Sequence, residues 1–248
     1  MNFRALADRL LDWIYPPQCV SCGAPGTLLC PECRSKLQPV GEHYCSKCGK
    51  PLQKGKPCRL CAESVFHFRS CRAPYIYSGP AADMIKKLKY NNCLGLVPIL
   101  SDLLLDFRGG PDWEVDLMLP VPLSDKRKAE RGFNQSELIA KAFAKKAGIP
   151  FTARALMKIR HTAQQVGLNA DERKENLTGA FAAESVLVKG KRLLLLDDVM
   201  TTGSTFSECS GVLLAAGARS VDCISVATAA IGYRSHDMPD RVRHEKIL

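Results

Sequence analysis

The sequence of 248 residues predicts an α/β protein, in which a parallel β-sheet flanked by helices follows a small cysteine-rich metal module. Two observations support this prediction. The continuous apolar run Leu193–Leu196, typical of a strand buried on both faces, precedes a helix pattern and a second apolar run, Val221–Val226. Near the amino end, eight of the twelve cysteines form four Cys-x2-Cys pairs. We therefore expect two domains, residues 1–70 and residues 71–248.

Charge and composition restrict the partners and the compartment. The net charge of +10 and the pI near 9.1 favour either a polyanionic partner or a basic face that is simply solvated. No apolar run approaches the roughly 18 residues of a membrane span. Because Asp8, Arg9 and Asp12 interrupt any apolar core of a secretion signal, the first 17 residues predict an amphipathic helix on a cytoplasmic protein.

The cysteine pairs predict two structural zinc sites. Two thiolates separated by two residues can hold one ion from a tight turn, and four thiolates close a tetrahedral site. In sequence order, the two sites would use Cys19, Cys22, Cys30 and Cys33, then Cys45, Cys48, Cys58 and Cys61. An interleaved pairing and a disulfide framework are the alternatives. Because four thiolates leave no open coordination position, we expect the ions to be structural.

Basic side chains gather around the second group of cysteines. Five of them lie within and between the third and fourth pairs: Lys47, Lys50, Lys54, Lys56 and Arg59. Tyr44 and Phe66 flank this group, where aromatic rings can stack on the bases of a single strand. The cluster therefore predicts a surface that meets the phosphates of single-stranded DNA.

The middle of the chain alternates strand and helix patterns. Residues 75–77 predict a strand, and two helical stripes follow, over 80–90 and over 96–107. Residues 115–119 predict the next strand. The prolines within 120–123 remove ladder donors and force a turn at the carboxyl end of that strand.

A basic loop, Lys126–Arg131, is predicted after this turn, and a helix through Ala147 follows it. Such side chains offset the charge of a phosphorylated ligand, and Arg131 is the first candidate among them, although a solvated turn is the ordinary alternative. Residues 158–181 predict a polar excursion, either a lid or a surface insertion. Its lone His161 is not assigned as a general base.

The most informative stretch follows the strand Leu193–Leu196. Two adjacent carboxylates, Asp197 and Asp198, come first. They precede a loop with hydroxyl groups and a helix N-terminus, which together form a candidate anion site: Thr201, Thr202, Gly203, Ser204 and Thr205. Open α/β sheets bind ligands at this edge. The carboxylates would repel a bare phosphate but accept hydrogen bonds from sugar hydroxyls, so the site predicts a phosphorylated sugar. An acidic turn before a capped helix is the alternative.

This stretch resembles the 5-phosphoribosyl-1-pyrophosphate (PRPP) motif of type I phosphoribosyltransferases. The resemblance implies that Asp197 and Asp198 bind the ribose 2′- and 3′-hydroxyls and that Thr201–Thr205 bind the 5′-phosphate, with Mg2+ accompanying PRPP. Thr201 stands where purine-salvage members carry an acidic residue, so we do not expect purine salvage.

The order of all the pieces is similar to that of the ComF family of competence-associated proteins. The matching strings span roughly residues 13–230: the paired cysteines after WIYPPQC, IKKLKY, PVPLSDKRKAERGFNQSELIA, the stretch from TAQQ to LTGAF, and LLLLDDVMTTGST. The resemblance implies a type I phosphoribosyltransferase fold with an N-terminal double zinc ribbon. It further implies a role in DNA uptake or the use of external DNA, with single-stranded DNA and a DNA-uptake helicase as partners.

Two classes of function fit this resemblance. A binding protein would hold PRPP or a related phosphoribosyl nucleotide while the ribbon holds the DNA strand. An active glycosyltransferase of nucleotide metabolism would transfer the phosphoribosyl group to an acceptor, with Arg131 stabilising the pyrophosphate leaving group. The sequence offers no obvious general base, which favours the binding protein.

Overall fold

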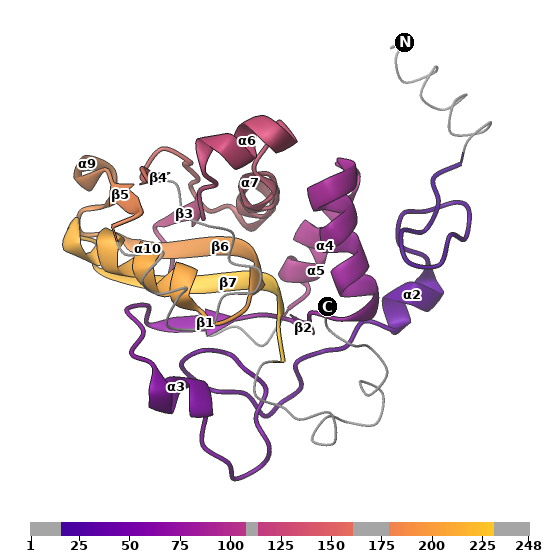
Figure 1. Ribbon diagram of the computed structural model, residues 1–248, viewed down its shortest axis with the longest axis horizontal. Coiled ribbons are helices and arrows are strands. Elements are labelled where there is room, and N and C mark those ends of the chain that lie inside the picture. Colours follow the sequence, from indigo (N-terminus) through magenta and orange to yellow (C-terminus); the bar gives the residue numbers. More distant parts are fainter. Residues whose placement is uncertain (1–15, 108–113, 161–178, 231–248) are drawn as a thin grey trace.

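A parallel β-sheet forms the centre of the computed structural model, which describes residues 16–107, 114–160 and 179–230 (Figure 1). Its strand order is β1-β7-β6-β3, and β2 pairs with β7 beyond β1. All these pairings are parallel. The strands are β1 (Ser70–Arg72), β2 (Tyr75–Ile76), β3 (Leu117–Pro120), β6 (Arg192–Met200) and β7 (Ser220–Thr228). The predicted α/β class is confirmed.

The central strand β6 extends further than the sequence predicted. Its ladder with β7 runs from Arg192 opposite Ser220 to Met200 opposite Thr228. Asp197 and Asp198 therefore lie within the strand near its carboxyl end, not after it. The apolar pattern stops before Asp197, but β7 supplies backbone partners up to Met200, so the strand continues.

Helices and cysteine groups cover both faces of the sheet. Leu194 and Leu196 point into one core cluster, and Leu193 and Leu195 point into the other, which explains the continuous apolar run. The first face is covered by α4 (Gly79–Asn91), α5 (Leu96–Leu105) and α7 (Gln135–Ala147). The second is covered by α10 (Ser204–Ala215), the antiparallel pair β4 (Leu156–Lys158) and β5 (Phe181–Ala183), and α9 (Ser185–Val188).

The predicted basic loop over Lys126–Arg131 is wrong, because these residues form α6 (Asp125–Arg131). Ser124 begins the helix by accepting the Arg127 N–H at 3.5 Å, and Gly132 ends it in the left-handed conformation. None of its residues is buried. The helix is therefore stabilised by its capping residues. Because it buries no apolar side chain, the sequence shows no apolar periodicity that would have predicted it.

The cysteine module lies along one edge of the sheet. Its short helices are α2 (Pro31–Ser35) and α3 (Arg59–Glu63). Figure 1 shows α2 on the side of α4 and α3 below β1, and the two cysteine groups accordingly belong to the two different core clusters. No helix among the described residues is long and apolar enough to cross a membrane. The expected amphipathic helix and His161 lie outside the described residues.

Candidate functional site

Asp198 is the most enclosed acid of the site. It is 4% exposed, and both of its carboxylate oxygens accept hydrogen bonds. Lys89 Nζ at the end of α4 donates to Oδ1 at 2.8 Å, and Gln135 Nε2 at the start of α7 donates to Oδ2 at 2.7 Å. Burial opposes the charge on Lys89, but Asp198 outweighs this effect and raises the pKa of the lysine. The carboxylate is thus held in one orientation.

Asp197, the neighbour of Asp198, has different hydrogen-bond partners and a raised pKa. Its Oδ1 accepts a hydrogen bond from Ser136 Oγ at 2.7 Å and another from the Asp198 N–H at 2.9 Å. Burial and then the neighbouring Asp198 charge raise the pKa of Asp197 to about 7. Asp197 is therefore partly protonated near neutral pH, and carboxyl oxygens of both residues can still accept hydrogen bonds from sugar hydroxyls.

The turn between α6 and α7 presents two of these partners. Asn134 begins α7: its Oδ1 accepts the Ser136 N–H at 3.1 Å, while its Nδ2 donates to the Val121 carbonyl at 3.0 Å. This cap directs Gln135 and Ser136 toward the acids. Lys89, Gln135 and Ser136 were not among the site residues predicted from the sequence. The strings IKKLKY and RGFNQS contain them, but nothing in the spacing of those strings connects them with Asp198.

Arg131 belongs to the same network. Its Nη1 donates to Gln135 Oε1 at 2.9 Å, and its guanidinium lies 5.3 Å from the centre of the Tyr90 ring. Tyr90 is 70% exposed. Arg131 is therefore one side chain away from Asp198, and its role toward a leaving group stays a prediction.

The loop after β6 leads directly into α10. Gly203 precedes the helix with φ at +80°, a conformation that favours glycine, and Thr202 Oγ1 lies 2.9 Å from Ser204 Oγ. The first turn of an α-helix has N–H groups without helical partners and carries partial positive charge, which together suit an anion. Thr201–Thr205 thus span the loop after β6 and the first two residues of α10.

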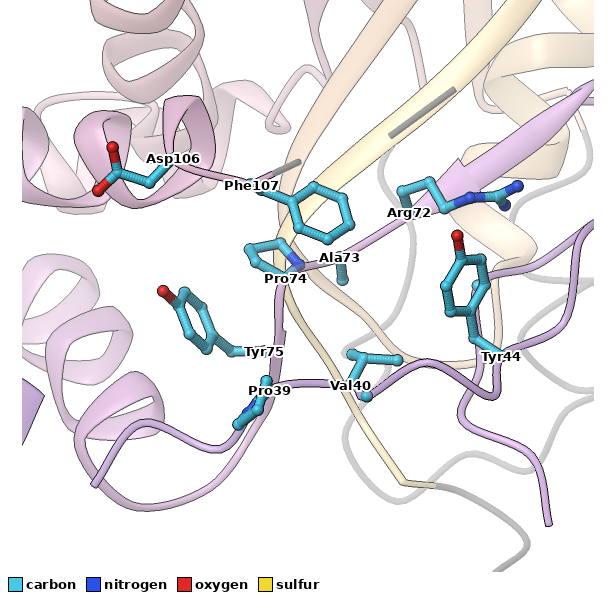
Figure 2. A pocket seen from close by; sticks show the side chains of 11 residues that line it. Pro39, Val40, Tyr44, Arg72, Ala73, Pro74, Tyr75, Asp106 and Phe107 are labelled. Carbon is cyan, nitrogen blue, oxygen red and sulfur yellow. The ribbon is translucent and has the colours of Figure 1, made fainter. Parts of the chain in front are cut away.

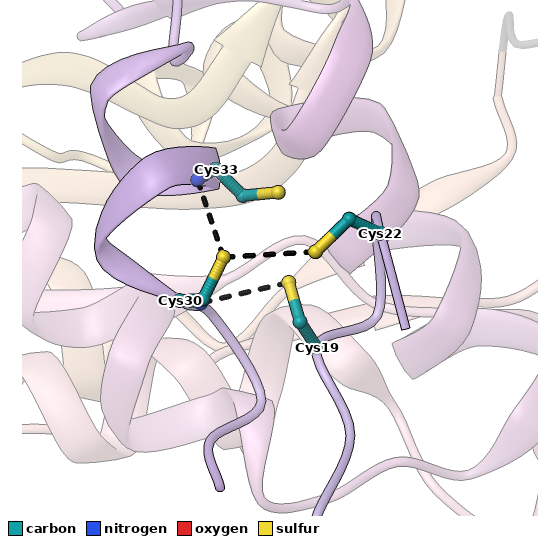
Figure 3. Close-up of side chains that lie close together, drawn as sticks. All are labelled: Cys19, Cys22, Cys30 and Cys33. Atoms are coloured by element: carbon teal, nitrogen blue, oxygen red, sulfur yellow. Dashed lines mark hydrogen bonds between the residues drawn. The ribbon is translucent and has the colours of Figure 1, made fainter. Parts of the chain in front are cut away.

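The cysteine sulfurs assemble into two groups in sequence order. Within each group the Sγ atoms lie within 4.8 Å of one another. Figure 3 shows the first group, in which the four side chains point toward one another. The Sγ atoms of Cys22 and Cys30 are 3.6 Å apart, and those of Cys48 and Cys58 are 3.5 Å apart. A tetrahedral zinc with Zn–S bonds of about 2.3 Å separates its sulfurs by roughly 3.8 Å, so both groups fit the ion. Burial opposes ionisation of Cys19, but backbone N–H groups, first that of Cys30, lower its pKa to about 6.

Two residues of the expected DNA-binding surface are buried. Lys50 is 3% exposed, and burial lowers its pKa to about 8. Phe66 is 8% exposed and stacks on Phe68 with ring centres 4.8 Å apart, so it cannot stack on a base. The exposed members of the cluster are Lys54, Lys56 and Arg59.

A cavity of about 270 Å³ separates the second cysteine group from the carboxyl end of α5 (Figure 2). Tyr44, Tyr75 and Phe107 line it. The guanidinium of Arg72 lies 5.1 Å from the centre of the Tyr44 ring, so Tyr44 already has a stacking partner. The cavity lies apart from the acids of β6, since neither of them lines it.

Comparison with known proteins gives matches over most of the chain. A double zinc ribbon domain matches residues 10–62, and a phosphoribosyl transferase domain matches residues 118–247. The DNA utilization protein YhgH of Shigella flexneri is 32% identical over 83% of this chain and 94% of its own length. Competence protein F of Haemophilus influenzae is 29% identical over 81% and 90%. Competence protein ComFC of Bacillus subtilis is 27% identical over 78% and 80%.

Among solved structures, the adenine phosphoribosyltransferase of Thermoanaerobacter pseudethanolicus matches 57% of this chain and 83% of its own at 16% identity, with a TM-score of 0.32. This likeness is too loose to add to the site. The matching domains and the sheet order confirm the expected phosphoribosyltransferase fold with its double zinc ribbon.

Proposed function

Because this chain belongs to the ComF family, which joins a double zinc ribbon to a phosphoribosyl transferase domain, we propose that it binds PRPP and single-stranded DNA during the use of external DNA. Residues 71–248 would form the PRPP-binding domain, and residues 1–70 would form the DNA-binding module. The four-cysteine groups of that module would each hold a structural zinc ion.

The observation that supports PRPP binding most strongly is the paired carboxylates beside the loop Thr201–Thr205. Lys89 and Gln135 fix Asp198 before the ligand arrives, so binding would cost little reordering of this side chain. Asp197 and Asp198 would accept hydrogen bonds from the ribose hydroxyls, and the first turn of α10 would bind the 5′-phosphate. Mg2+ would neutralise the pyrophosphate charge when bound with PRPP.

The names of the relatives support the DNA part of the proposal, since they refer to DNA utilization and competence. On this chain, the exposed side chains Lys54, Lys56 and Arg59 form a basic edge on the second ribbon. Helix α6 offers a second basic surface with Lys126 and Lys128. We propose that the ribbon edge binds the strand, because Lys54, Lys56 and Arg59 lie in one ribbon without an acidic residue between them.

Fluorescence anisotropy with a short labelled oligonucleotide at several salt concentrations tests this choice. Each neutralised phosphate contributes a slope of about −0.7 to the salt dependence. Replacing Lys54, Lys56 and Arg59 with alanine should flatten the slope by roughly two units. The matched substitution of Lys126, Arg127 and Lys128 should leave it unchanged. The reverse result would move DNA to α6, and no binding at low salt would remove DNA from the proposal.

The position of Arg131 in the hydrogen-bond network of the acids favours a second candidate function, that of an active phosphoribosyltransferase. In that reaction the bond from ribose C1 to the pyrophosphate oxygen breaks while C1 bonds to an acceptor. Arg131, which contacts Asp198 through Gln135, would stabilise the pyrophosphate leaving group. Pyrophosphate release from PRPP and Mg2+, measured with and without DNA, separates the two functions. Release that Arg131→Met abolishes would identify a transferase, and binding without release would identify a binding protein.

A further inference from the structure

The first cysteine pair of each zinc group forms the same kind of turn, which we call a knuckle: residues 19–24 and residues 45–50. A glycine with positive φ follows the second cysteine of each, Gly23 at +80° and Gly49 at +69°. In each, the N–H of the first cysteine donates over 2.8 Å to the carbonyl of the residue after that glycine. This residue is Ala24 in the first knuckle and Lys50 in the second. Equivalent turns therefore present a methyl group and a long cation.

Lys50 reaches from the second knuckle to the end of the sheet. Its Nζ donates to the Met200 carbonyl at 3.2 Å and also to the carbonyl of Ala229. Met200 is the last residue of β6 and directly precedes the loop Thr201–Thr205. A lysine is almost never this deeply buried unless its charge is paired, and these two carbonyls accept from it. The ammonium thus connects the knuckle to the start of the loop.

Further contacts join the second ribbon and the residues just after it to β1 and to the loop Thr201–Thr205. The Cys71 N–H of β1 donates to the Lys47 carbonyl at 2.8 Å, and a Cβ added at Gly49 would collide with the Cys71 carbonyl oxygen. Just after the ribbon, the Phe66 ring lies so close to Gly203 that a Cβ there would stand 3.1 Å from it. Lys50 of the ribbon and Phe66 just after it therefore contact the two sides of the loop, at Met200 and at Gly203.

We propose that Lys50 is a positioning residue that couples the second zinc site to the loop Thr201–Thr205. The inference rests on the proposed function, since it takes this loop as the sugar-phosphate site. Metal binding orders the second knuckle and thereby holds Lys50 in place, and Lys50 in turn holds the Met200 carbonyl. Because the loop is then already ordered, ligand binding costs less conformational entropy. By linkage, the ligand then strengthens zinc binding at the second site by the same factor, while the first site is unaffected.

Zinc competition with a chromophoric chelator at equilibrium tests the coupling, with PRPP and Mg2+ as the probe. In the full-length wild type, PRPP should raise the affinity for one of the two zinc equivalents by at least about fivefold and leave the other unchanged. Lys50→Met keeps the aliphatic stem but loses the donor, so it should abolish this effect and weaken PRPP binding by a similar factor. Gln53→Met, an exposed position of the same ribbon outside the basic edge, is the matched control and should behave like wild type.

Hydrogen exchange of the amides of residues 200–207 gives a readout that needs no ligand. Lys50→Met should speed this exchange at least about fivefold, and Gln53→Met should not. Unchanged exchange together with unchanged PRPP coupling in Lys50→Met would overturn the inference. If wild type does not bind PRPP but Lys50→Met still speeds the exchange, the proposed function fails while the coupling stands. If Lys50→Met does not fold, wild type still decides: PRPP that binds without changing either zinc affinity overturns the coupling.

Discussion

Replacing Lys89 with methionine should destabilise the protein through Asp198. The two side chains are 20% and 5% exposed, with 2.8 Å between Nζ and Oδ1, so the substitution leaves a buried carboxylate without its cation. Breaking such a pair commonly costs about 3–5 kcal/mol. Gln135 still donates to the other oxygen at 2.7 Å, so we expect a loss at or just below the bottom of that range, about 2–3 kcal/mol.

Thermal unfolding at pH 7.5 measures this loss. For a chain of this size, the loss corresponds to a fall in the midpoint of roughly 5–10 °C. The matched control is Lys86→Met, an exposed lysine on the same helix, which should change the midpoint little. In the double variant Lys89→Met/Asp198→Asn the stranded charge is gone, so at least about 1 kcal/mol should return. A Lys89→Met variant as stable as Lys86→Met would refute the reasoning.

Three further predictions concern protonation, metal and backbone conformation. The pKa of Asp197 is raised from 3.8 to about 7, so the native chain keeps a proton that the unfolded chain has lost, and stability falls as pH rises through this window. Asp197→Asn should therefore match wild type near pH 4 and melt higher at pH 8; a difference independent of pH would contradict this. Elemental analysis should give two zinc ions per chain, and chelation should expose residues 19–61 to protease; unchanged protease resistance would argue against structural zinc. Gly49→Ala should cost more free energy of unfolding than Gly23→Ala, about 2 kcal/mol against about 1, because only Gly49 faces the Cys71 carbonyl; equal losses would show that the contact does not matter.

Local patterns were sufficient to predict the framework of the fold. The run Leu193–Leu196 predicts a strand because both faces of a parallel sheet are apolar, and the structure places these leucines in the two core clusters. The spacing of the cysteine pairs likewise predicts that each tight turn brings two thiolates together, whereas the structure was needed to choose the grouping in sequence order over an interleaved one. These features depend on residues that are close in sequence.

Contacts between distant residues explain what the sequence did not reveal. Lys89 is 109 residues from Asp198, and Lys50 is 150 residues from Met200. Each lysine lies in a basic stretch that reads as solvent-exposed, and its burial depends on an acceptor that only the folded chain supplies. Phe66 was likewise expected at the surface. It is buried because it stacks on Phe68 and because Gly203, which is distant in the sequence, packs against it.

The most direct test of the central proposal is a calorimetric titration of the zinc-loaded protein with PRPP in the presence of Mg2+. Asp198→Ala removes the acceptor that Lys89 and Gln135 hold in place. It should weaken binding by about 1.5–3 kcal/mol, roughly ten- to 150-fold, while Glu63→Ala at an exposed acid should not. Equal affinities of wild type and Asp198→Ala, or no binding of PRPP by wild type, would contradict the assignment of a sugar-phosphate site at the end of β6.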